Sequence, residues 1–346
     1  MRGLKNYGHK KNHAAIFWLS VVLLFSIILV YADSNQKPED FTLGQNLPEK
    51  TSTLGVALSE SKKEEIAKTV KPMEINLLRC DSGKHEIMDL ETYIIGVLSG
   101  EVPPSFEKSA LEAQAVVART YTLSVLNNGG ELCDFYGHCQ AYCDTETLKQ
   151  RWGSEFEKNY QRYFSAVQET AGLIVTYDNK LAKTFFHSTC GGKTASSQEV
   201  WGENLAYLQS VDCSWDKDAP RYQERIKVKI SELPNRLGIE NVAVSSGNII
   251  PSLISVTHSG RVETVSFGGE KIKATDFRKK LQLNSTNFSF ASEDGNLLID
   301  THGYGHGVGL CQYGANGMAK EGYNYEDIIK HYYQGVDIVP MSKLNT

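Results

Sequence analysis

A glycine-rich segment near the C-terminus carries the side chains best suited to chemistry. Residues 303–315 read Gly-Tyr-Gly-His-Gly-Val-Gly-Leu-Cys-Gln-Tyr-Gly-Ala. Alternating glycines let the backbone adopt positive φ or approach a ligand closely, while His306, Gln312 and Tyr313 supply hydrogen-bonding groups where a helix should begin. The glycines do not follow the G-x-G-x-x-G spacing of a dinucleotide-binding loop. The segment therefore predicts one wall of a binding or catalytic site.

Glu101 is the candidate general acid. A helix is expected over residues 89–98, and Gly100 and the pair Pro103-Pro104 should end it, which places Glu101 on a rigid turn beyond the helix. Apolar neighbours such as Val102 would exclude water and raise the pKa of the carboxyl group, so that it could donate a proton. The alternative is an ordinary solvated loop glutamate.

The next predicted helix, residues 108–126, has a face of small and apolar residues suited to close packing, and we expect it to be the structural spine. Gln114, Arg119 and Tyr121 also lie on it. Arg119 stands among alanines and valines, so if it is buried it needs an acidic or carbonyl partner.

A second polar segment, Ser188-Thr189-Cys190-Gly191-Gly192-Lys193-Thr194, offers hydroxyl groups, a thiol and an amine that could line a groove and bind sugar hydroxyls. Cys190 is also a candidate nucleophile if folding brings a histidine beside it. Three nearby aromatic residues either stack on sugar rings or pack in the core: Trp201, Tyr207 and Trp215.

The cysteines suggest a metal. The chain has seven, an odd number that cannot all pair as disulfides, and one group is compact: Cys133, His138, Cys139 and Cys143. Three or four soft ligands on one loop could hold zinc as a structural clip. Disulfide pairing and plain burial remain open, as does a hydrolytic zinc centre.

The composition and the N-terminus bound the class of protein. The chain has 346 residues, of which 41% are hydrophobic and 22% are charged, so it can bury a full hydrophobic core. Its net charge of −5 does not indicate a nucleic-acid partner. Residues 14–32 form an uncharged apolar run after a basic segment, which predicts a membrane anchor with residues 1–13 in the cytoplasm. A cleaved signal peptide is the alternative. Residues 33–71 are polar and predict a flexible linker.

The remaining pattern predicts an α+β fold over residues 72–346, with helices and antiparallel strands in a main core and a smaller mixed lobe at residues 222–300. A β-hairpin is expected at residues 172–187, turning at Asp178-Asn179. Further helices are expected at residues 230–237, 274–281, 308–320 and 325–332.

Four motifs together resemble the stage II sporulation protein D family: Leu-Glu-Thr-Tyr…Gly-Glu-Val-Pro at 90–103, Ala-Gln-Ala-Val-Val-Ala-Arg-Thr-Tyr at 113–121, His-Ser-Thr-Cys-Gly-Gly at 187–192, and Gly-His-Gly-Val-Gly…Gln-Tyr-Gly-Ala at 305–315. The resemblance extends from about Glu74 to the C-terminus. It implies a lytic transglycosylase that cuts peptide-free peptidoglycan strands between N-acetylmuramic acid and N-acetylglucosamine, leaving a 1,6-anhydro product. A non-catalytic enhancer of a cell-wall amidase is the alternative, because related domains occur in such proteins.

The resemblance also implies roles for individual residues. Glu101 would be the sole catalytic acid and base, and the glycan groove would be lined by Gln114, Arg119, Thr189, Cys190, Gly191, Gly192, Lys193, His306, Gln312 and Tyr313. Family members with cysteines at the positions of Cys133 and Cys139 are expected to bind zinc, and no organic cofactor is expected. The protein would be a single-pass membrane protein between the mother-cell and forespore membranes, with a cell-wall amidase and a membrane scaffold as partners.

Overall fold

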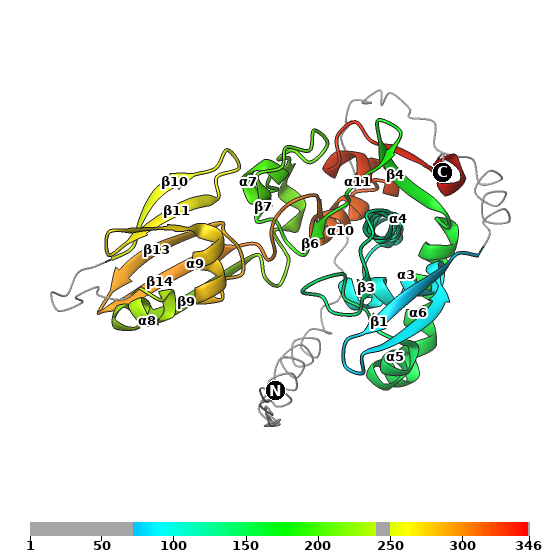
Figure 1. Cartoon of the computed structure of the whole chain (residues 1–346), viewed down its shortest axis with the longest axis horizontal. Coiled ribbons are helices and arrows are strands. Elements are labelled where there is room, and N and C mark those ends of the chain that lie inside the picture. Colours follow the sequence, from blue (N-terminus) through cyan, green and yellow to red (C-terminus); the bar gives the residue numbers. More distant parts are fainter. Residues whose placement is uncertain (1–71, 240–249, 345–346) are drawn as a thin grey trace, which may run out of the picture. The chain divides into compact units, whose positions relative to one another are not determined.

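The computed structural model describes residues 72–239 and 250–344. Helices and mostly antiparallel sheets make up this part of the chain, which is α+β as predicted (Figure 1). The predicted N-terminal segment, anchor and linker, residues 1–71, lie outside the described residues. Within the described ranges, none of the helices has both the length and the apolar character needed to cross a membrane.

One hydrophobic cluster combines residues from the first and last parts of the described chain, from 75 to 213 and from 308 to 336. Its helices are α3 (Leu90–Glu101), α4 (Lys108–Asn127), α5 (Thr145–Trp152), α6 (Phe156–Glu169), α7 (Ser197–Trp201), α10 (Gln312–Lys320) and α11 (Tyr325–Tyr332). Its strands are β1 (Glu74–Arg79), β2 (Lys84–Asp89), β3 (Leu132–Cys133), β4 (Leu173–Tyr177), β5 (Lys180–Leu181), β6 (Phe186–His187), β7 (Gly192–Lys193), β8 (Asp212–Cys213), β15 (Leu310–Cys311) and β16 (Asp337–Pro340).

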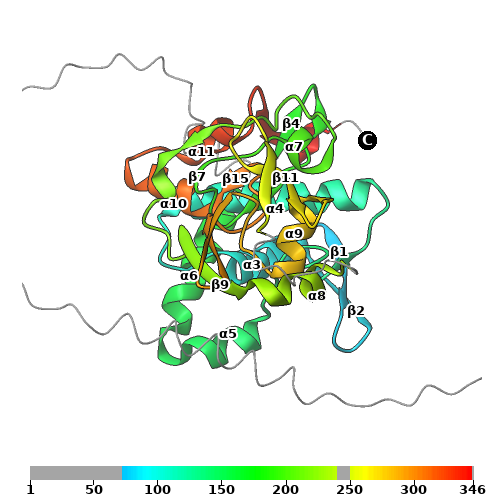
Figure 2. The same cartoon turned by 90° about the vertical axis from the view of Figure 1, so that its left-hand side faces the viewer.

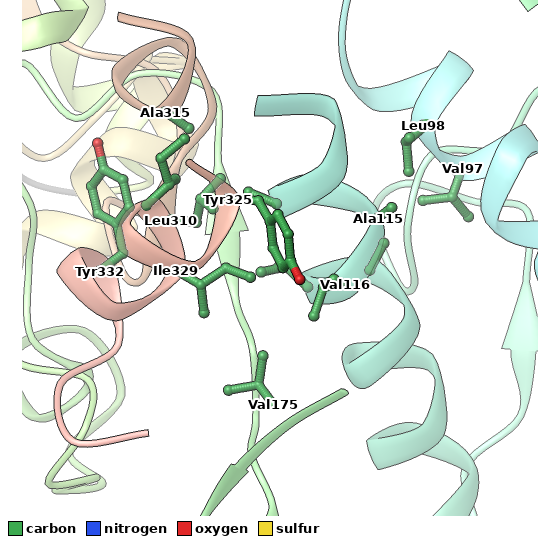
Figure 3. Packing of buried hydrophobic residues seen from close by; sticks show 14 of the residues in the cluster. Val97, Leu98, Ala115, Val116, Val175, Leu310, Ala315, Tyr325, Ile329 and Tyr332 are labelled. Atoms are coloured by element: carbon green, nitrogen blue, oxygen red, sulfur yellow. The ribbon is translucent and has the colours of Figure 1, made fainter. Parts of the chain in front are cut away.

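Helix α4 is the spine of this core, as its small-residue pattern predicts. Ala113, Ala115 and Ala118 are fully buried, and their short side chains let α3, α6, α10 and α11 pack closely against α4. Figure 3 shows α4 between Val97 of α3 and Ile329 of α11. The motif-bearing ends of the described chain are therefore held against one rigid helix.

Small sheets surround the spine. Strands β2, β1 and β3 form one sheet, and β16, β4 and β5 form another. The predicted hairpin turn is confirmed, since Asp178 and Asn179 have φ of 49° and 59° between the antiparallel β4 and β5. Its second strand is shorter than predicted, because β5 ends at Leu181 and the chain then forms β6, which pairs in parallel with β15.

A second hydrophobic cluster contains residues between 228 and 299. Its elements are β9 (Gln223–Lys229), α8 (Leu233–Leu237), β10 (Ser252–Val256), β11 (Val262–Phe267), β12 (Glu270–Lys273), α9 (Ala274–Leu281), β13 (Phe288–Glu293) and β14 (Asn296–His302). The strands form two antiparallel sheets, β10-β11-β12 and β13-β14-β9, and α9 packs on β11 (Figure 2). Phe277 and Phe288 stack in this core with ring centroids 5.5 Å apart.

Candidate active site

Glu101 is the last residue of α3, not a residue of the turn beyond it. The helix continues through Gly100 to Glu101, and Val102 is its C-cap, before the proline pair. The Glu101 carboxylate accepts two hydrogen bonds, one at Oε1 from the backbone N–H of Ala141 (2.7 Å) and one at Oε2 from Nε2 of Gln312 (3.2 Å). Its partners thus come from segments 40 and 211 residues away in the sequence.

Glycines on α3 allow the first of these contacts. A Cβ on Gly100 would lie only 2.8 Å from the carbonyl carbon of Ala141, so any other residue would push this segment away from the helix. One turn earlier, the carbonyl oxygen of Gly96 accepts a hydrogen bond from the N–H of Cys143 (3.0 Å). Gly96 and Gly100, four residues apart, therefore leave one face of α3 without side chains, and the segment that contains Ala141 packs on that face.

Glu101 lies in a cleft with a volume of about 640 Å³. The cleft is lined by residues from α3, α4, the loop before α5, β6, α7 and the glycine-rich segment: Gly100, Glu101, Tyr121, Tyr136, Gly137, His138, Cys139, Gln140, Ala141, Phe185, Phe186, His187, Ser188, Trp201, Tyr304, Gly305, His306 and Gln312. Among these described lining residues, Glu101 has the only carboxyl group, and none is a lysine or arginine.

The surroundings of Glu101 raise its pKa. Burial is the main cause, because it penalises the charged carboxylate, and the hydrogen bonds from Ala141 and Gln312 offset part of this effect. The carboxyl group therefore holds its proton to a higher pH than a solvated glutamate. This is the property expected of a general acid, although the catalytic role itself stays a prediction.

The glycine-rich segment forms one wall of the cleft, as predicted. Gly303, Gly305, Gly307 and Gly309 all have positive φ, between 72° and 119°. Burial and the positive charge of Arg278 lower the pKa of His306 to about 4, so its ring is neutral at physiological pH. Its Nδ1 accepts a hydrogen bond from the N–H of Val308 (3.0 Å), which places the proton on Nε2.

Aromatic side chains face the same cleft. Trp201, at the end of α7, is 46% exposed and packs against Phe185 and His306, with ring centroids 4.5 Å and 5.2 Å away. Tyr304 is also exposed, and the guanidinium of Arg221 lies 4.4 Å from its ring centroid. Of the three aromatic residues singled out in the sequence, Trp201 lines this cleft, Tyr207 is buried, and Trp215 lines a different hollow.

Several residues assigned to the groove lie elsewhere. Arg119 is fully buried, with its guanidinium paired to Glu91 and donating to the carbonyl oxygen of Leu173 (3.1 Å). It thus has the acidic and carbonyl partners that burial demands, but the prediction that it lines the groove is wrong. Gln114 is also buried in the packed face of α4, outside the cleft lining.

The Ser188–Thr194 segment is also mostly turned away from the cleft. Ser188 lines it, but Thr189 is buried and bridges by its backbone to Tyr304, and Gly191 and Gly192 do not line it. The Nζ of Lys193 lies 3.9 Å from the carboxylate of Asp212. Tyr313 lines the hollow that contains Trp215, and its ring packs edge-on against Phe106 (5.1 Å).

Cys190 is neither a groove residue nor a suitable nucleophile. It is fully buried, and its Sγ lies 3.0 Å from Oδ2 of Asp216. Burial and the neighbouring Cys213 raise the pKa of the Cys190 thiol well above its ordinary value, so little thiolate is present. The reason for the error is geometric, since the motif leaves the cleft after Ser188, and Thr189 and Cys190 are buried in the core.

The rim cysteine group, Cys133, His138 and Cys139, borders the cleft. The two Sγ atoms and Nδ1 of His138 lie 3.3 Å from one another in all three pairings. A disulfide needs an S–S distance near 2.05 Å, whereas ligands of one tetrahedral zinc ion lie roughly 3–4 Å apart, so this donor set fits zinc. Cys143 does not belong to the group, and its Sγ accepts a hydrogen bond from Arg151 (3.3 Å), so the structure brings together three of the four candidate ligands.

Some cleft residues were not identified from the sequence. The backbone N–H of Ala141 leaves no trace in residue type, although the Gly96–Gly100 spacing marks where a segment could approach α3. Tyr304 lies inside the glycine-rich segment and Tyr121 on the spine helix, but residue type alone does not indicate that their side chains line the cleft. The sequence around Phe185 and Phe186 is typical of a β-strand and contains nothing that indicates a functional site.

Comparisons with known proteins identify the family. The family model described as "Stage II sporulation protein" matches residues 81–177. Over 288 residues the chain is 36% identical to stage II sporulation protein D of Bacillus amyloliquefaciens, an alignment that covers 81% of this chain and 83% of that protein. The chain belongs to the stage II sporulation protein D family. The resemblance deduced from the four motifs is therefore confirmed.

Two further relatives come from Bacillus subtilis (strain 168). Its stage II sporulation protein D is 36% identical over 281 residues, covering 79% of this chain and 81% of that protein. A protein named amidase enhancer is 23% identical over 300 residues, covering 70% of this chain and 40% of that protein. Membership in the family connects this chain to sporulation.

Proposed function

We propose that this protein is a lytic transglycosylase that cleaves peptidoglycan glycan strands during sporulation, with Glu101 as its sole catalytic acid and base. The observation that supports this most is that Glu101 has the lone carboxyl group in the described lining of the cleft, which also contains no lysine or arginine. Ordinary glycosidases use two carboxyl groups, one as acid and one as base or nucleophile. A reaction in which one group serves both steps in turn fits this cleft better.

In the first step, protonated Glu101 donates its proton to the glycosidic oxygen between N-acetylmuramic acid and N-acetylglucosamine, and the bond from that oxygen to C1 breaks. The raised pKa lets Glu101 keep this proton to a higher pH than a solvated glutamate would. As the proton leaves, negative charge develops on the carboxylate. The N–H of Ala141 and the amide of Gln312 are already aimed at its two oxygens and stabilise that charge.

In the second step, the carboxylate removes the proton from the C6 hydroxyl of the same sugar, and the C6 oxygen bonds to C1. This closes the 1,6-anhydro ring and returns Glu101 to its protonated form. The nucleophile belongs to the substrate, so its effective concentration is high and no enzyme nucleophile or activated water is needed. The exposed Trp201 and Tyr304 offer flat apolar faces on which sugar rings can stack.

Zinc, if bound by the rim cysteine group, would act as a structural clip. Cys139 is followed after one residue by Ala141, whose N–H holds Glu101, so an ion at Cys133, His138 and Cys139 would fix this segment. We further propose that residues 14–32 anchor the protein in a membrane, with residues 72–346 outside the cytoplasm between the mother-cell and forespore membranes. A cell-wall amidase that supplies peptide-free strands and a membrane scaffold are the proposed partners.

The decisive experiment is to incubate the purified full chain with peptide-free glycan strands and analyse the products by mass spectrometry. We expect products lighter by one water than hydrolysis products, as the anhydro ring requires. Glu101→Gln should lower turnover by at least about a hundredfold, because the amide cannot donate the proton, while binding of the strands persists. Glu157→Gln, an exposed carboxyl on α6, is the matched control and should cleave normally.

Other outcomes would redirect the assignment. Hydrated products would show a hydrolase and disprove the anhydro mechanism. Strand binding with no cleavage by the unmodified chain would favour an amidase enhancer, the function that the name of one relative suggests. Normal cleavage by Glu101→Gln would exclude Glu101 as the acid.

A further inference from the structure

Three buried cysteines and one buried aspartate meet in the main core, behind the cleft. This buried cysteine group consists of Cys190, Cys213, Asp216 and Cys311, each at most 1% exposed. Their sulfur atoms and a carboxylate oxygen all lie within 4.8 Å of one another. Oδ2 of Asp216 lies 3.0 Å from Sγ of Cys190 and 3.6 Å from Sγ of Cys311.

Hydrophobic packing does not account for this group. Buried thiols alone are common in cores, but a buried carboxylate is costly unless both of its oxygens are satisfied. Oδ2 of Asp216 accepts hydrogen bonds from the N–H groups of Cys190 and Gly191 (both 2.8 Å). Oδ1 is equally buried, and the described residues offer it no hydrogen-bond partner. Oδ1 of Asp216 is therefore a buried acceptor that the described residues leave without a hydrogen bond.

The surroundings are arranged like the outer contacts of a thiolate metal centre. The backbone N–H of Gly314 donates to Sγ of Cys311 (3.3 Å), and the hydroxyl of Tyr332 lies 3.1 Å from Sγ of Cys213. Gly314 has to be a glycine, because a Cβ there would collide with both that hydroxyl and that sulfur. The buried guanidinium of Arg261 donates to the carbonyl oxygen of Cys190 (2.8 Å) and adds positive charge nearby.

We propose that Cys190, Cys213, Asp216 and Cys311 bind a zinc ion in a closed, tetrahedral structural site. Three thiolates and one carboxylate are a donor set that zinc accepts, and their spacing is that of ligands around one ion. On loading, the thiol protons leave to solvent and the sulfurs bond to zinc. All four positions are filled by protein and the site is sealed from water, so the ion is structural.

A disulfide explains the group less well. One disulfide would use two of the three thiols and would still leave Oδ1 of Asp216 without a partner. The zinc site instead uses every member. It also needs no oxidant.

The site joins three segments: the loop after β6, the end of β8 with the turn that follows it, and the residue before α10. Cys311 is the N-cap of α10 and directly precedes Gln312, whose amide donates to Glu101. The ion would thus hold Gln312 in position. This last consequence rests on the proposed function, whereas zinc binding itself does not.

The test measures metal content in the full chain. With the rim ligands removed by Cys133→Ser and Cys139→Ser, we expect the purified protein to retain about one zinc ion per chain. Adding Cys213→Ser or Asp216→Asn should reduce that content severalfold or more, whereas adding Cys143→Ser, a thiol outside both groups, should leave it unchanged. Unchanged zinc after Cys213→Ser would overturn the proposal.

Two further readouts do not require the core variants to fold. Cobalt loaded into the chain that lacks the rim ligands should give thiolate-to-cobalt charge-transfer absorption and the ligand-field bands of a tetrahedral ion. Peptide mass spectrometry without reduction should find Cys190, Cys213 and Cys311 as free thiols after the metal is removed. A disulfide between any two of them, or a protein without metal whose three thiols are all free as isolated, would disprove the site. Failure of the proposed transglycosylase activity would leave these metal measurements unaffected.

Discussion

Helix α3 carries a glutamate at each end, and the two have opposite surroundings. Glu91, in the first turn, pairs with the buried guanidinium of Arg119 through both carboxylate oxygens (2.9 Å and 3.1 Å to Nε) and also accepts from the N–H of Gly172 (3.0 Å). Glu101, the last residue, accepts from a backbone amide and a glutamine amide. The described lining of its cleft provides no lysine or arginine.

The difference shows how one residue type can serve structure at one end of a helix and, under the proposed function, chemistry at the other. The guanidinium of Arg119 fixes the Glu91 carboxylate in position, whereas burial raises the pKa of Glu101 and its hydrogen-bond partners are neutral. Glu91 and Arg119 join α3, α4 and the start of β4 into one frame. Glu101 is held at the other end of α3 on that frame, and its raised pKa lets it keep a proton to a higher pH than a solvated glutamate would.

Breaking the Glu91–Arg119 pair should have the largest effect on stability. Arg119→Met leaves the mostly buried Glu91 carboxylate without its cation, and we expect a loss of about 3–5 kcal/mol in the free energy of unfolding. Urea denaturation followed by circular dichroism measures this. The double variant Glu91→Gln/Arg119→Met should recover part of the loss, since neither charge remains. A loss below about 1 kcal/mol in the single variant would contradict the structural role of the pair.

Glu101→Gln should have the reverse profile, with a large loss of turnover and no loss of stability. Because the pKa of Glu101 is raised in the folded state, its charged form destabilises the fold. This destabilisation is absent when the pH is below the pKa of Glu101 in the unfolded chain, and it is fully present when the pH is above the pKa of Glu101 in the folded chain. The neutral glutamine removes that penalty, so the variant should be at least as stable as the parent at neutral pH. Marked destabilisation of the variant there would show that the carboxylate is structural, like that of Glu91.

Removing one neutral donor should shift the pH dependence of cleavage. Gln312→Leu deletes a hydrogen bond that favours the Glu101 carboxylate, so the pKa of Glu101 should rise further. The alkaline limb of the pH–rate profile, where the acid loses its proton, should move to higher pH. Tyr313→Phe, next in the chain but outside the cleft, should leave the limb where it is. If the alkaline limb of the pH–rate profile moved to lower pH in Gln312→Leu, Glu101 would be refuted as the acid.

Chelation should have the smallest effect on chemistry. If zinc at the rim cysteine group only fixes the segment that contains Ala141, removing it should lower cleavage by about tenfold at most. The assay compares initial rates with and without a strong chelator, followed by added zinc. Complete loss that zinc restores, together with hydrated products, would instead favour a hydrolytic zinc centre, and the contrast between Glu91 and Glu101 would no longer explain catalysis.

The sequence predicted most of the elements because their signals are local. Residues 325–332 and 274–281 form helices with the expected bounds, and the turn at Asp178-Asn179 takes the positive φ that hairpins require. Glu101, His306 and Gln312 were placed in one site and do line one cleft. Those three lie in segments whose glycines and prolines restrict the backbone, so their place is marked by residue type.

The errors have a common physical origin. Arg119 and Thr189 lie in the same motifs as cleft residues but point into the core, because neighbouring side chains of a helix or an extended segment face different directions. The meeting of Cys190, Cys213, Asp216 and Cys311 depends on segments up to 121 positions apart, which no spacing rule brings together. The N–H of Ala141 is invisible in sequence because every residue except proline has one.

The entry and exit of the second hydrophobic cluster have a consequence for how this family can change. The chain enters that lobe after Tyr222 and leaves it at Gly303, and the N–H of Gly303 donates to the carbonyl oxygen of Tyr222 (2.8 Å). Two positions so distant in sequence are thus neighbours in space. An inserted domain with adjoining ends can be enlarged, trimmed or exchanged over evolution while the surrounding chain keeps its path. Its length can therefore vary among related proteins while the segment that contains His306 and Gln312 keeps its path.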